Sequence, residues 1–256
     1  MNEKDHTILK NKKEARERLV SLRKTIEHHR YLYHVQNISE ISPEALDALK
    51  HELVLIEGAY PDMVTPDSPS QRVAGEPLKG FKKIKHTVEQ WSFNDAFNVE
   101  EMREFDTRVQ NMLAKEQVRG LAQNRVAPSY VCELKIDGLK VVLTYENGIL
   151  VTAATRGDGV VGEDVTANVK MIESVPLSLA EKVSGVFEGE VWMAKSTLVR
   201  LNKAEVKAGR EPFANPRNLA AGTIRQLDAN VVKSRTLDVF IYDVTALDRE
   251  LPKTQT

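Results

Sequence analysis

The chain has 256 residues, of which 41% are hydrophobic and 29% are charged, and its formal net charge is −1. These are ordinary globular values, and the length suits one large domain or one domain with a small appendage. No run approaches the ~20 apolar residues of a membrane helix, and the polar N-terminus lacks the apolar core of a signal peptide. We therefore expect a cytoplasmic protein without a membrane segment. The balanced charge provides no argument for nucleic-acid binding by itself.

The single cysteine, Cys132, excludes an intrachain disulfide and a four-cysteine zinc site. It lies in an apolar, strand-like run, so we expect it to be a small buried hydrophobe.

The N-terminal region is predicted to form two helices. The first covers about residues 12–36, and the second begins after Ser42, a good N-cap, with Pro43 at its first position and Tyr60-Pro61 at its end. Their apolar faces are formed by Leu19, Leu22, Ile26 and Tyr33, and by Leu46, Leu49, Leu53 and Ile56. Helices this short need a partner surface to be stable, so we expect a helical hairpin.

Residues 61–98 are rich in Pro, Asp, Ser and Gly, which is typical of a loop or linker, and we place the domain boundary there. A further helix is predicted to begin at Asn98, because Glu101 follows three residues later as in a capping box. The apolar stripe of this helix is Met102, Phe105, Val109 and Leu113.

From Tyr130 the hydrophobic period changes to that of strands. YVCELK, LKVVLTY and ILVTAATR are predicted strands, and Asn147-Gly148 between the last two favours a type I′ hairpin turn. GEDVTANVKMI is predicted to be helical, VFEGEVWM a strand, residues 196–208 a helix, NPRNLAAGTIRQLD a loop entering a helix, and LDVFIYDV a late strand. This order predicts an α+β domain with mostly antiparallel pairing.

The segment VCELKIDGLKVV combines a lysine with acids at the end of an apolar strand. Side chains two residues apart share a face of a strand, so Glu133, Lys135 and Asp137 are expected to line one surface of a pocket. Gly138 permits a sharp turn or a close approach to a ligand. A buried lysine can serve as a nucleophile, although a lysine salt-bridged on a sheet face would show the same local pattern.

Three further segments carry polar groups in similar settings. Arg156 with Gly157 and Gly159 could contact phosphate or ribose oxygens, and Glu190 could hold a ribose hydroxyl, or a metal ion through water. Asn215, Arg217 and Arg225 flank a helix start and could contact successive phosphates. Each segment has a structural alternative: a glycine-rich turn, an edge-strand acid, and a helix cap with solvated charges.

In this order, ELKIDGL, TRGDGVVGEDVTANV, GEV and FANPRNLAAGTIRQLD resemble the NAD-dependent DNA ligase family from about Leu19 to Val244, and TPDSPSQRVAGEPL and SFNDAF strengthen the resemblance. It implies a helical, nicotinamide-mononucleotide-binding subdomain at residues 1–70. It also implies a covalent nucleotidyltransferase (ATP-grasp-like adenylation) domain at residues 71–256. Lys135 would take AMP from NAD and pass it to the 5′-phosphate of a nick in double-stranded DNA.

The resemblance also implies roles for individual residues. Asp137 would act with Lys135 in catalysis, and Arg217 and Arg225 would serve later steps near DNA phosphates. NAD binding is expected from Tyr33, His34, Asp47, Ser92, Phe93, Glu133, Arg156, Glu190 and Tyr242. Mg²⁺ (or Mn²⁺) is the expected ion, held by no direct protein ligand but by Glu190 through water, and we expect a monomer.

The chain departs from the family pattern at Pro43, Leu46 and Glu188, where the family carries Asp, Tyr and usually Arg. The family's later Asp-Gly-Val-Val-x-Lys strand and zinc finger do not occur before Thr256, so we expect a C-terminally incomplete adenylation domain. A fragment that self-adenylylates or only binds nucleotide is therefore one alternative. An ATP-dependent ligase or capping enzyme is another, which the N-terminal helices argue against.

Overall fold

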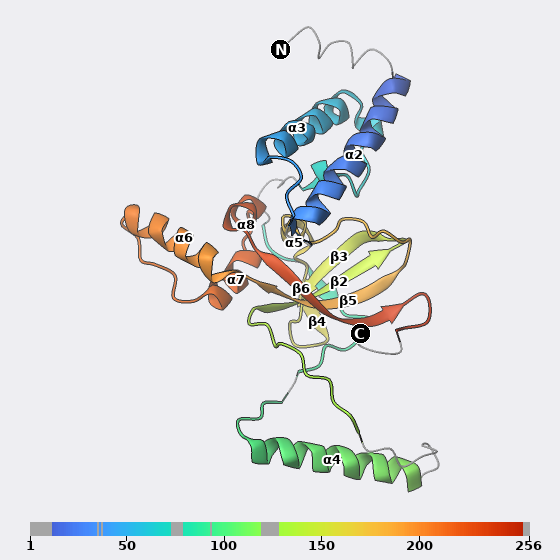
Figure 1. Cartoon of the computed structure of the whole chain (residues 1–256), viewed down its shortest axis with the longest axis vertical. Helices are drawn as coiled ribbons and strands as arrows, with labels where there is room; N and C mark the ends of the chain where they lie inside the picture. The colour runs from blue at the N-terminus through green and yellow to red at the C-terminus, as the bar shows by residue number, and fades with distance from the viewer. Residues whose placement is uncertain are drawn as a thin grey trace. The chain divides into compact units, whose positions relative to one another are not determined.

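The computed structural model describes residues 12–34, 36, 38–72, 79–92, 94–118 and 128–252 (Figure 1). The chain divides into two compact units. The first comprises Met1–Glu89 and Ile136–Leu251, and the second comprises Gln90–Lys135 with Pro252–Thr256. No helix among the described residues is both long enough and apolar enough to cross a membrane.

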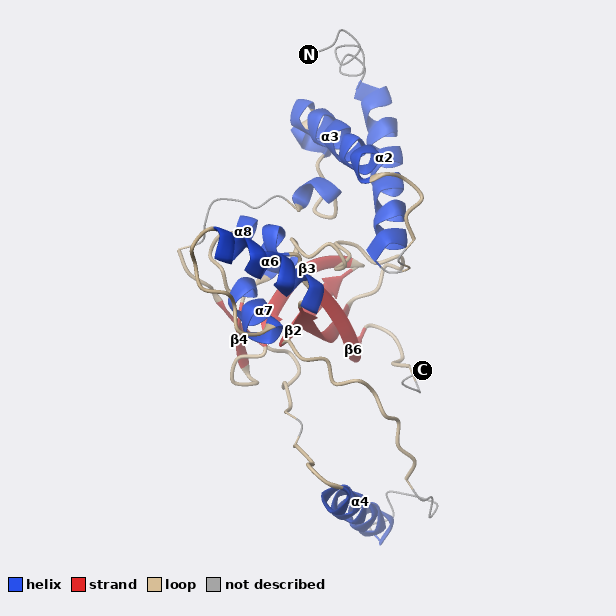
Figure 2. Cartoon of the chain, turned by 60° about the vertical axis from the view of Figure 1, so that its left-hand side comes forward, coloured by secondary structure: helices blue, strands red, loops and turns tan. Residues whose placement is uncertain are grey.

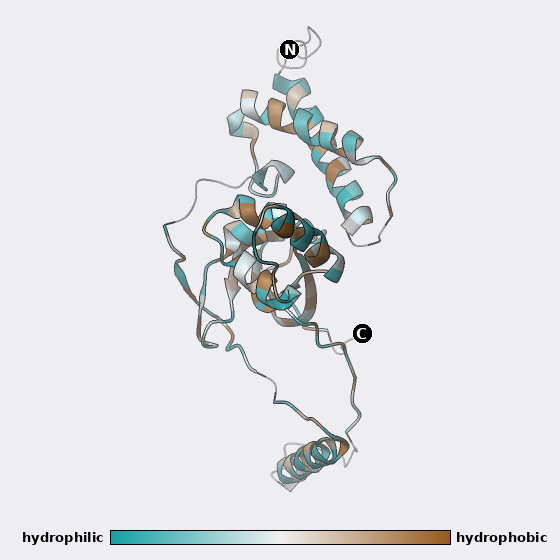
Figure 3. Ribbon diagram, turned by 90° about the vertical axis from the view of Figure 1, so that its left-hand side faces the viewer, coloured by the Kyte–Doolittle hydropathy of each residue, from teal (hydrophilic) through white to brown (hydrophobic). Residues whose placement is uncertain are grey.

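The N-terminal helices form the expected hairpin. Helix α2 (Lys12–His34) packs on α3 (Pro43–Ala59), and Ser42 Oγ accepts a hydrogen bond from the Ala45 N–H at 3.2 Å, which confirms the predicted N-cap. Two short 3-10 turns follow, η1 (Pro61–Met63) and η2 (Pro69–Gln71). Apolar and polar residues alternate along both helices (Figure 3). The hairpin core consists of Ala15, Leu19, Leu22, Ile26, Leu53, Ile56 and Met63, with Leu46, Leu49 and Tyr60 packed against it.

Tyr33 is a correction to the predicted apolar stripe, because its side chain is 56% exposed. On α2 the hairpin core ends at Ile26, and the next buried position on this side is the polar Arg30. The burial of Arg30 is explained by its ion pair with Glu27 at 2.8 Å and by hydrogen bonds to backbone carbonyls, described below, rather than by apolar packing.

Helix α4 (Val99–Val118) belongs to the second unit, and its N-terminus is capped by Asn98 and Glu101 in a variant of the expected capping box. Asn98 Oδ1 accepts from the Glu101 N–H at 2.9 Å, and the Glu101 carboxylate accepts from the Phe97 N–H at 2.7 Å. The expected apolar stripe is not buried: Met102, Phe105 and Leu113 are exposed. The Phe105 ring packs on a later aromatic residue of the same unit, Tyr130.

The main sheet has four antiparallel strands in the order β3-β2-β5-β6. These strands are β2 (Leu139–Glu146), β3 (Ile149–Thr155), β5 (Gly185–Trp192) and β6 (Asp238–Leu247). Asn147 and Gly148 have φ angles of 48° and 81°, as the predicted β2–β3 turn requires. A separate antiparallel pair joins β1 (Lys83–Lys85) to β4 (Val161–Glu163), two strands that the sequence did not predict. The α+β class with antiparallel sheets is confirmed.

Helices cover one face of the main sheet (Figure 2). They are α5 (Thr166–Val169), α7 (Pro216–Ile224) and α8 (Ala229–Arg235), while α6 (Lys195–Lys207) precedes α7 along the chain. The core contains Val141, Leu143 and Val191 from the strands, Leu219 and Ile224 from α7, and Val232 from α8. Helix α8 was not predicted, and α5 is far shorter than the predicted GEDVTANVKMI helix.

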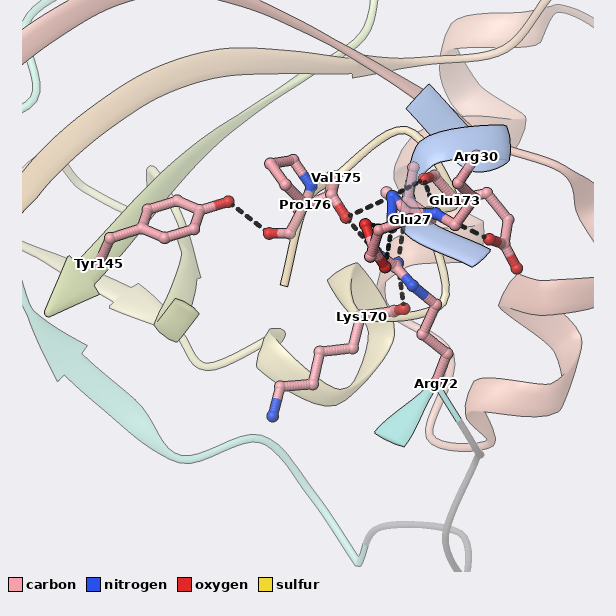
Figure 4. Close-up of polar contacts among 9 residues, drawn as sticks. Glu27, Arg30, Arg72, Tyr145, Lys170, Glu173, Val175 and Pro176 are labelled. Atoms are coloured by element: carbon pink, nitrogen blue, oxygen red, sulfur yellow. Dashed lines mark hydrogen bonds and ion pairs between the residues drawn. The ribbon is translucent and has the colours of Figure 1, made fainter. Parts of the chain in front are cut away.

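The turn after α5 is held by two buried arginines from the N-terminal region (Figure 4). Arg72 Nη1 donates to the carbonyls of Lys170 and Ile172, both at 2.8 Å, and Arg72 Nη2 donates to Val175 O. Arg30 Nε donates to Glu173 O at 2.9 Å. The guanidinium groups therefore take carbonyls that a longer α5 would have used within the helix.

Arg72 is 6% exposed, and among the described residues no carboxylate forms an ion pair with its guanidinium. Burial, assisted by the nearby charge of Arg30, lowers the pKa of Arg72 to about 10. Arg72 therefore remains a cation at neutral pH. Its charge is stabilised by carbonyl dipoles rather than by a carboxylate bonded directly to it.

We predict that Arg72→Met will lower the free energy of unfolding by about 3 kcal/mol, because the hydrogen bonds from Arg72 to the carbonyls of Lys170, Ile172 and Val175 are lost. Urea unfolding followed by circular dichroism measures this change. The matched control is Arg249→Ala, which removes an exposed ion pair to Glu181 and should cost less than about 1 kcal/mol. Equal losses in the two variants would contradict the structural role of Arg72.

Candidate functional site

The sheet face opposite the covering helices carries charged side chains at its centre. Lys140 on β2 is directly opposite Glu190 on β5, and Val142 is opposite Glu188, so these residues share one face. Lys140 Nζ lies 2.6 Å from Glu188 Oε2, and both side chains are largely buried. The acid at position 188 is thus neutralised within the sheet, which the sequence did not reveal.

Tyr242 lies on β6 where the register with β5 shifts. It is beside Glu188 and Glu190, the two acids of β5. Burial raises the pKa of its phenol, and the negative charges of Glu190 and Glu188 raise it further. The ring therefore stays neutral at physiological pH. The structure brings Tyr242 and Glu190 together, as expected for two residues of one binding site.

A cavity of about 120 Å³ lies on this same face. It is lined by residues 84–88, which include part of β1, and by Val142, Thr144, Thr152, Ala154 and Val186 of the sheet. Small-molecule sites usually measure ~300–1,000 Å³. The described residues around this cavity thus enclose space for only part of a nucleotide.

The glycine-rich segment is a tight turn that supports one wall of the cavity. Gly157 and Gly159 have φ angles of 58° and 99°, in the region that favours glycine. The Gly159 N–H donates to Arg156 O at 3.1 Å, and Asp158 Oδ1 accepts from the N–H groups of Val160 and Val161. The expectation that the Gly159 amide faces a ligand is therefore not met, because the turn itself uses that amide.

His86 connects the cavity wall to this turn. Its Nε2 lies 3.1 Å from Arg156 O, and its backbone N–H donates to Val160 O at 2.9 Å. The side chain of Arg156 is partly buried at the end of β3. Sequence reasoning missed His86, whose isolated position in a loop provides no motif.

The lysine segment differs from its prediction. Residues 128–137 form no strand, and Glu133 and Lys135 are exposed, as is Leu134 at 81%. Cys132 is also exposed, which corrects the expectation of burial. A strand requires a partner for its backbone groups, and among the described residues none pairs with residues 130–135. The predicted YVCELK strand is therefore absent from the described residues.

Asp137 and Gly138, at the end of the lysine segment, have defined contacts. Asp137 Oδ1 accepts from Arg217 Nη1 at 3.0 Å, so two predicted site residues meet in an exposed ion pair. Gly138 is required by packing, because a Cβ there would lie 2.0 Å from the Val191 carbonyl oxygen. The close approach is to the neighbouring strand, β5, rather than to a ligand.

Of the predicted arginines, Arg217 is in the first turn of α7 and Arg225 is the C-cap of the same helix. Asn215 is the N-cap of this helix, because its Oδ1 accepts from the Asn218 N–H at 2.7 Å. Arg225 Nε lies 3.0 Å from Glu163 Oε2 on β4. Both Arg217 and Arg225 are thus exposed cations held by exposed or partly exposed acids.

The other residues expected to bind NAD are mostly exposed or lie outside the described part of the chain. Tyr33, Asp47 and Ser92 are exposed. His34 is the last residue of α2, but its side chain lies outside the described atoms, and Phe93 lies outside the described residues. Among the departures from the family pattern, Pro43 begins α3 and Leu46 packs against the hairpin core.

Comparison with known proteins identifies the chain at family level. Residues 78–256 match the family described as NAD-dependent DNA ligase adenylation domain, and residues 12–74 match the DNA ligase-like N-terminal NAD+-binding domain. The chain belongs to the NAD-dependent DNA ligase adenylation family. The recognition drawn from the ordered motifs is thereby confirmed.

Individual relatives agree with this assignment. The chain is 47% identical over 243 residues to a protein named DNA ligase from Thermotoga neapolitana, covering 95% of this chain and 34% of the relative. A DNA ligase from Pelotomaculum thermopropionicum is 49% identical over 229 residues, covering 89% and 32% of the two chains. This ligase-family chain thus spans about a third of the length of the curated relatives it matches.

We predict that Gly138→Ala will destabilise the fold by about 3 kcal/mol, because the added methyl group overlaps a backbone carbonyl that cannot move freely. Chemical denaturation measures the loss. Gly58→Ala in α3 is the control, since its methyl group meets open space and should stabilise the helix by about 0.5–1 kcal/mol. A neutral Gly138→Ala variant would exclude the packing role.

The buried ion pair between Lys140 and Glu188 leads to a further prediction. Lys140→Met should cost about 3–5 kcal/mol, because it leaves Glu188 buried without a counter-charge. The double variant Lys140→Met/Glu188→Met should recover most of that loss, as measured in a double-mutant cycle of unfolding free energies. If the double variant were as unstable as the single one, lost packing rather than charge would be the cause.

Proposed function

We propose that this chain performs the adenylylation step of an NAD-dependent DNA ligase, with Lys135 as the nucleophile. The observation that supports this most strongly is the pair of family matches, which together extend over residues 12–74 and 78–256. The first match is described as NAD+-binding, which favours NAD over ATP as the donor. Lys135, Asp137 and Gly138 lie within the second match.

The proposed first step balances as a phosphoryl transfer. The neutral Lys135 Nζ forms a bond to the α-phosphorus of NAD, and the bond from that phosphorus to the oxygen of nicotinamide mononucleotide breaks. The electron pair leaves with the mononucleotide, the amine nitrogen gives up one proton to solvent, and AMP stays joined to Lys135 through a P–N bond. The amine must be neutral to attack, because only then does its nitrogen have a free electron pair.

In the proposed later steps, AMP passes to the 5′-phosphate of a nick and the 3′-hydroxyl displaces it to form a phosphodiester. Asp137, Arg217 and Arg225 are the residues that we assign to these steps. The exposed pair between Asp137 and Arg217 is suited to exchange for DNA phosphate, because such pairs contribute only ~0–1 kcal/mol. Nicked double-stranded DNA is therefore the proposed partner.

The proposed NAD contacts follow the family resemblance. Tyr242 would pack against adenine, and Arg156 and Glu190 would hold the ribose. The proximity of Tyr242 to Glu190 supports this arrangement. The other residues that we assign to NAD are Glu133, Ser92 and Phe93 on the adenosine side, and Tyr33, His34 and Asp47 on the nicotinamide side.

The proposal extends to the metal ion, the architecture, the oligomeric state and the location of the protein. Glu190, a partly exposed carboxylate on the sheet face, suits a hydrated Mg²⁺ or Mn²⁺, which would supply positive charge beside the phosphates. We also propose an ATP-grasp-like nucleotidyltransferase architecture, a division at about residue 70 into 1–70 and 71–256, a monomeric state and a cytoplasmic location. The antiparallel sheet is compatible with that architecture.

A second candidate function is self-adenylylation without sealing. It is supported by the descriptions of the two family matches, which name an NAD+-binding domain and an adenylation domain.

We predict that incubation with NAD and magnesium adds one adenylate to the chain, as measured by intact-mass spectrometry. Lys135→Ala should abolish the gain, because it removes the attacking amine. Lys203→Ala, which removes an exposed lysine on α6, is the matched control and should retain it. A gain with ATP but not NAD would contradict the donor assignment.

A nicked duplex added to the adenylylated protein separates the two candidates. Sealing of the nick supports complete ligase activity, whereas a stable adenylate without sealed product supports the self-adenylylating domain. Adenylate that persists on Lys135→Ala would overturn the proposed nucleophile.

A further inference from the structure

Two histidines and an acid converge at the C-terminal half of α2. His28 and His29 are consecutive on this helix, and Glu40 lies in the segment that leads to α3. His28 Nε2 is 3.2 Å from Glu40 Oε2, and His29 Nδ1 is 3.7 Å from the same oxygen. The ring centroids of the two histidines are 5.2 Å apart, and all three ligand atoms lie within 4.8 Å of one another.

The environment of His29 distinguishes this cluster from an ordinary surface group. Its Nδ1 is buried and has no hydrogen-bond partner among the described residues. A buried polar atom without a partner costs about 1–3 kcal/mol. A ligand that bonds to His29 Nδ1 would remove this cost. The nearest acidic oxygen, on Glu40, is too distant to accept a hydrogen bond.

A metal ion would satisfy this nitrogen. Two imidazoles and a carboxylate form a ligand set that zinc uses, with a water molecule in the fourth position. Zinc–ligand bonds of about 2.0–2.1 Å place neighbouring tetrahedral ligand atoms about 3.3 Å apart. The two separations from Glu40, 3.2 and 3.7 Å, are close to this value. His28 and Glu40 are exposed, which leaves access for the ion and for water.

We propose that His28, His29 and Glu40 bind a divalent transition metal of the zinc class. The ion would join the segment before α3 to α2 and thereby restrain the connection between the two helices of the hairpin. This site lies in the N-terminal hairpin and does not depend on the proposed ligase function, so the two can fail independently.

The test is titration of the tag-free, chelator-treated chain with ZnCl₂ by isothermal calorimetry. One zinc ion per chain is the expected result, and Co²⁺ should give the intense visible absorption of a four-coordinate complex. His29→Ala, His28→Ala and Glu40→Gln should each weaken binding at least about tenfold. Circular dichroism of each variant confirms that the hairpin remains helical.

His51→Ala is the matched control, because it removes an exposed histidine from α3 outside the cluster. It should leave zinc affinity unchanged. Absence of stoichiometric binding, or equal weakening by His51→Ala and His29→Ala, would overturn the proposal. Retention of full affinity in a folded His28→Ala/His29→Ala variant would do the same.

Discussion

The first unit depends on two buried arginines that reach from the N-terminal region to the turn after α5. Arg30 and Arg72 donate to the carbonyls of residues 170–175, and Tyr145 of β2 donates to Pro176 O at 2.7 Å (Figure 4). A buried cation without direct hydrogen bonds would be expensive, so these carbonyls must be presented together. That requirement ends α5 early and connects the helical hairpin, the turn and the sheet through one set of hydrogen bonds.

The sheet face opposite the helices shows how charge is arranged around the central strand β5. β5 carries Glu188 and Glu190, and each acid has a distinct setting: Glu188 is buried against Lys140, while Glu190 is partly exposed beside Tyr242. Lys140 therefore neutralises Glu188 within the sheet. Of the two acids on β5, Glu190 is the one that suits a ligand. The glycine-rich turn contributes indirectly, because it holds the segment around His86 that forms the cavity wall.

The three departures from the family pattern have local structural explanations. Pro43 begins α3 at a position where its missing N–H costs nothing, Leu46 adds apolar contact to the hairpin core, and Glu188 is neutralised by Lys140. Stability thus accounts for all three residues without reference to a ligand. Tyr33 and Asp47, which the proposed function assigns to the nicotinamide side of NAD, are exposed.

Local patterns in the sequence determined the features that depend on neighbouring residues. The Ser42 and Asn98 helix starts, the Asn147-Gly148 hairpin and the ordered ligase motifs could all be read directly, because capping, turn geometry and motif spacing act over a few positions. Tertiary structure decided what depends on distant partners. Only it showed that the YVCELK segment has no strand partner among the described residues, that Lys140 neutralises Glu188, and that Arg72 shortens α5 from 98 residues away. Hydrogen bonds and ion pairs between such distant residues exist only once the chain has folded, so no local pattern records them.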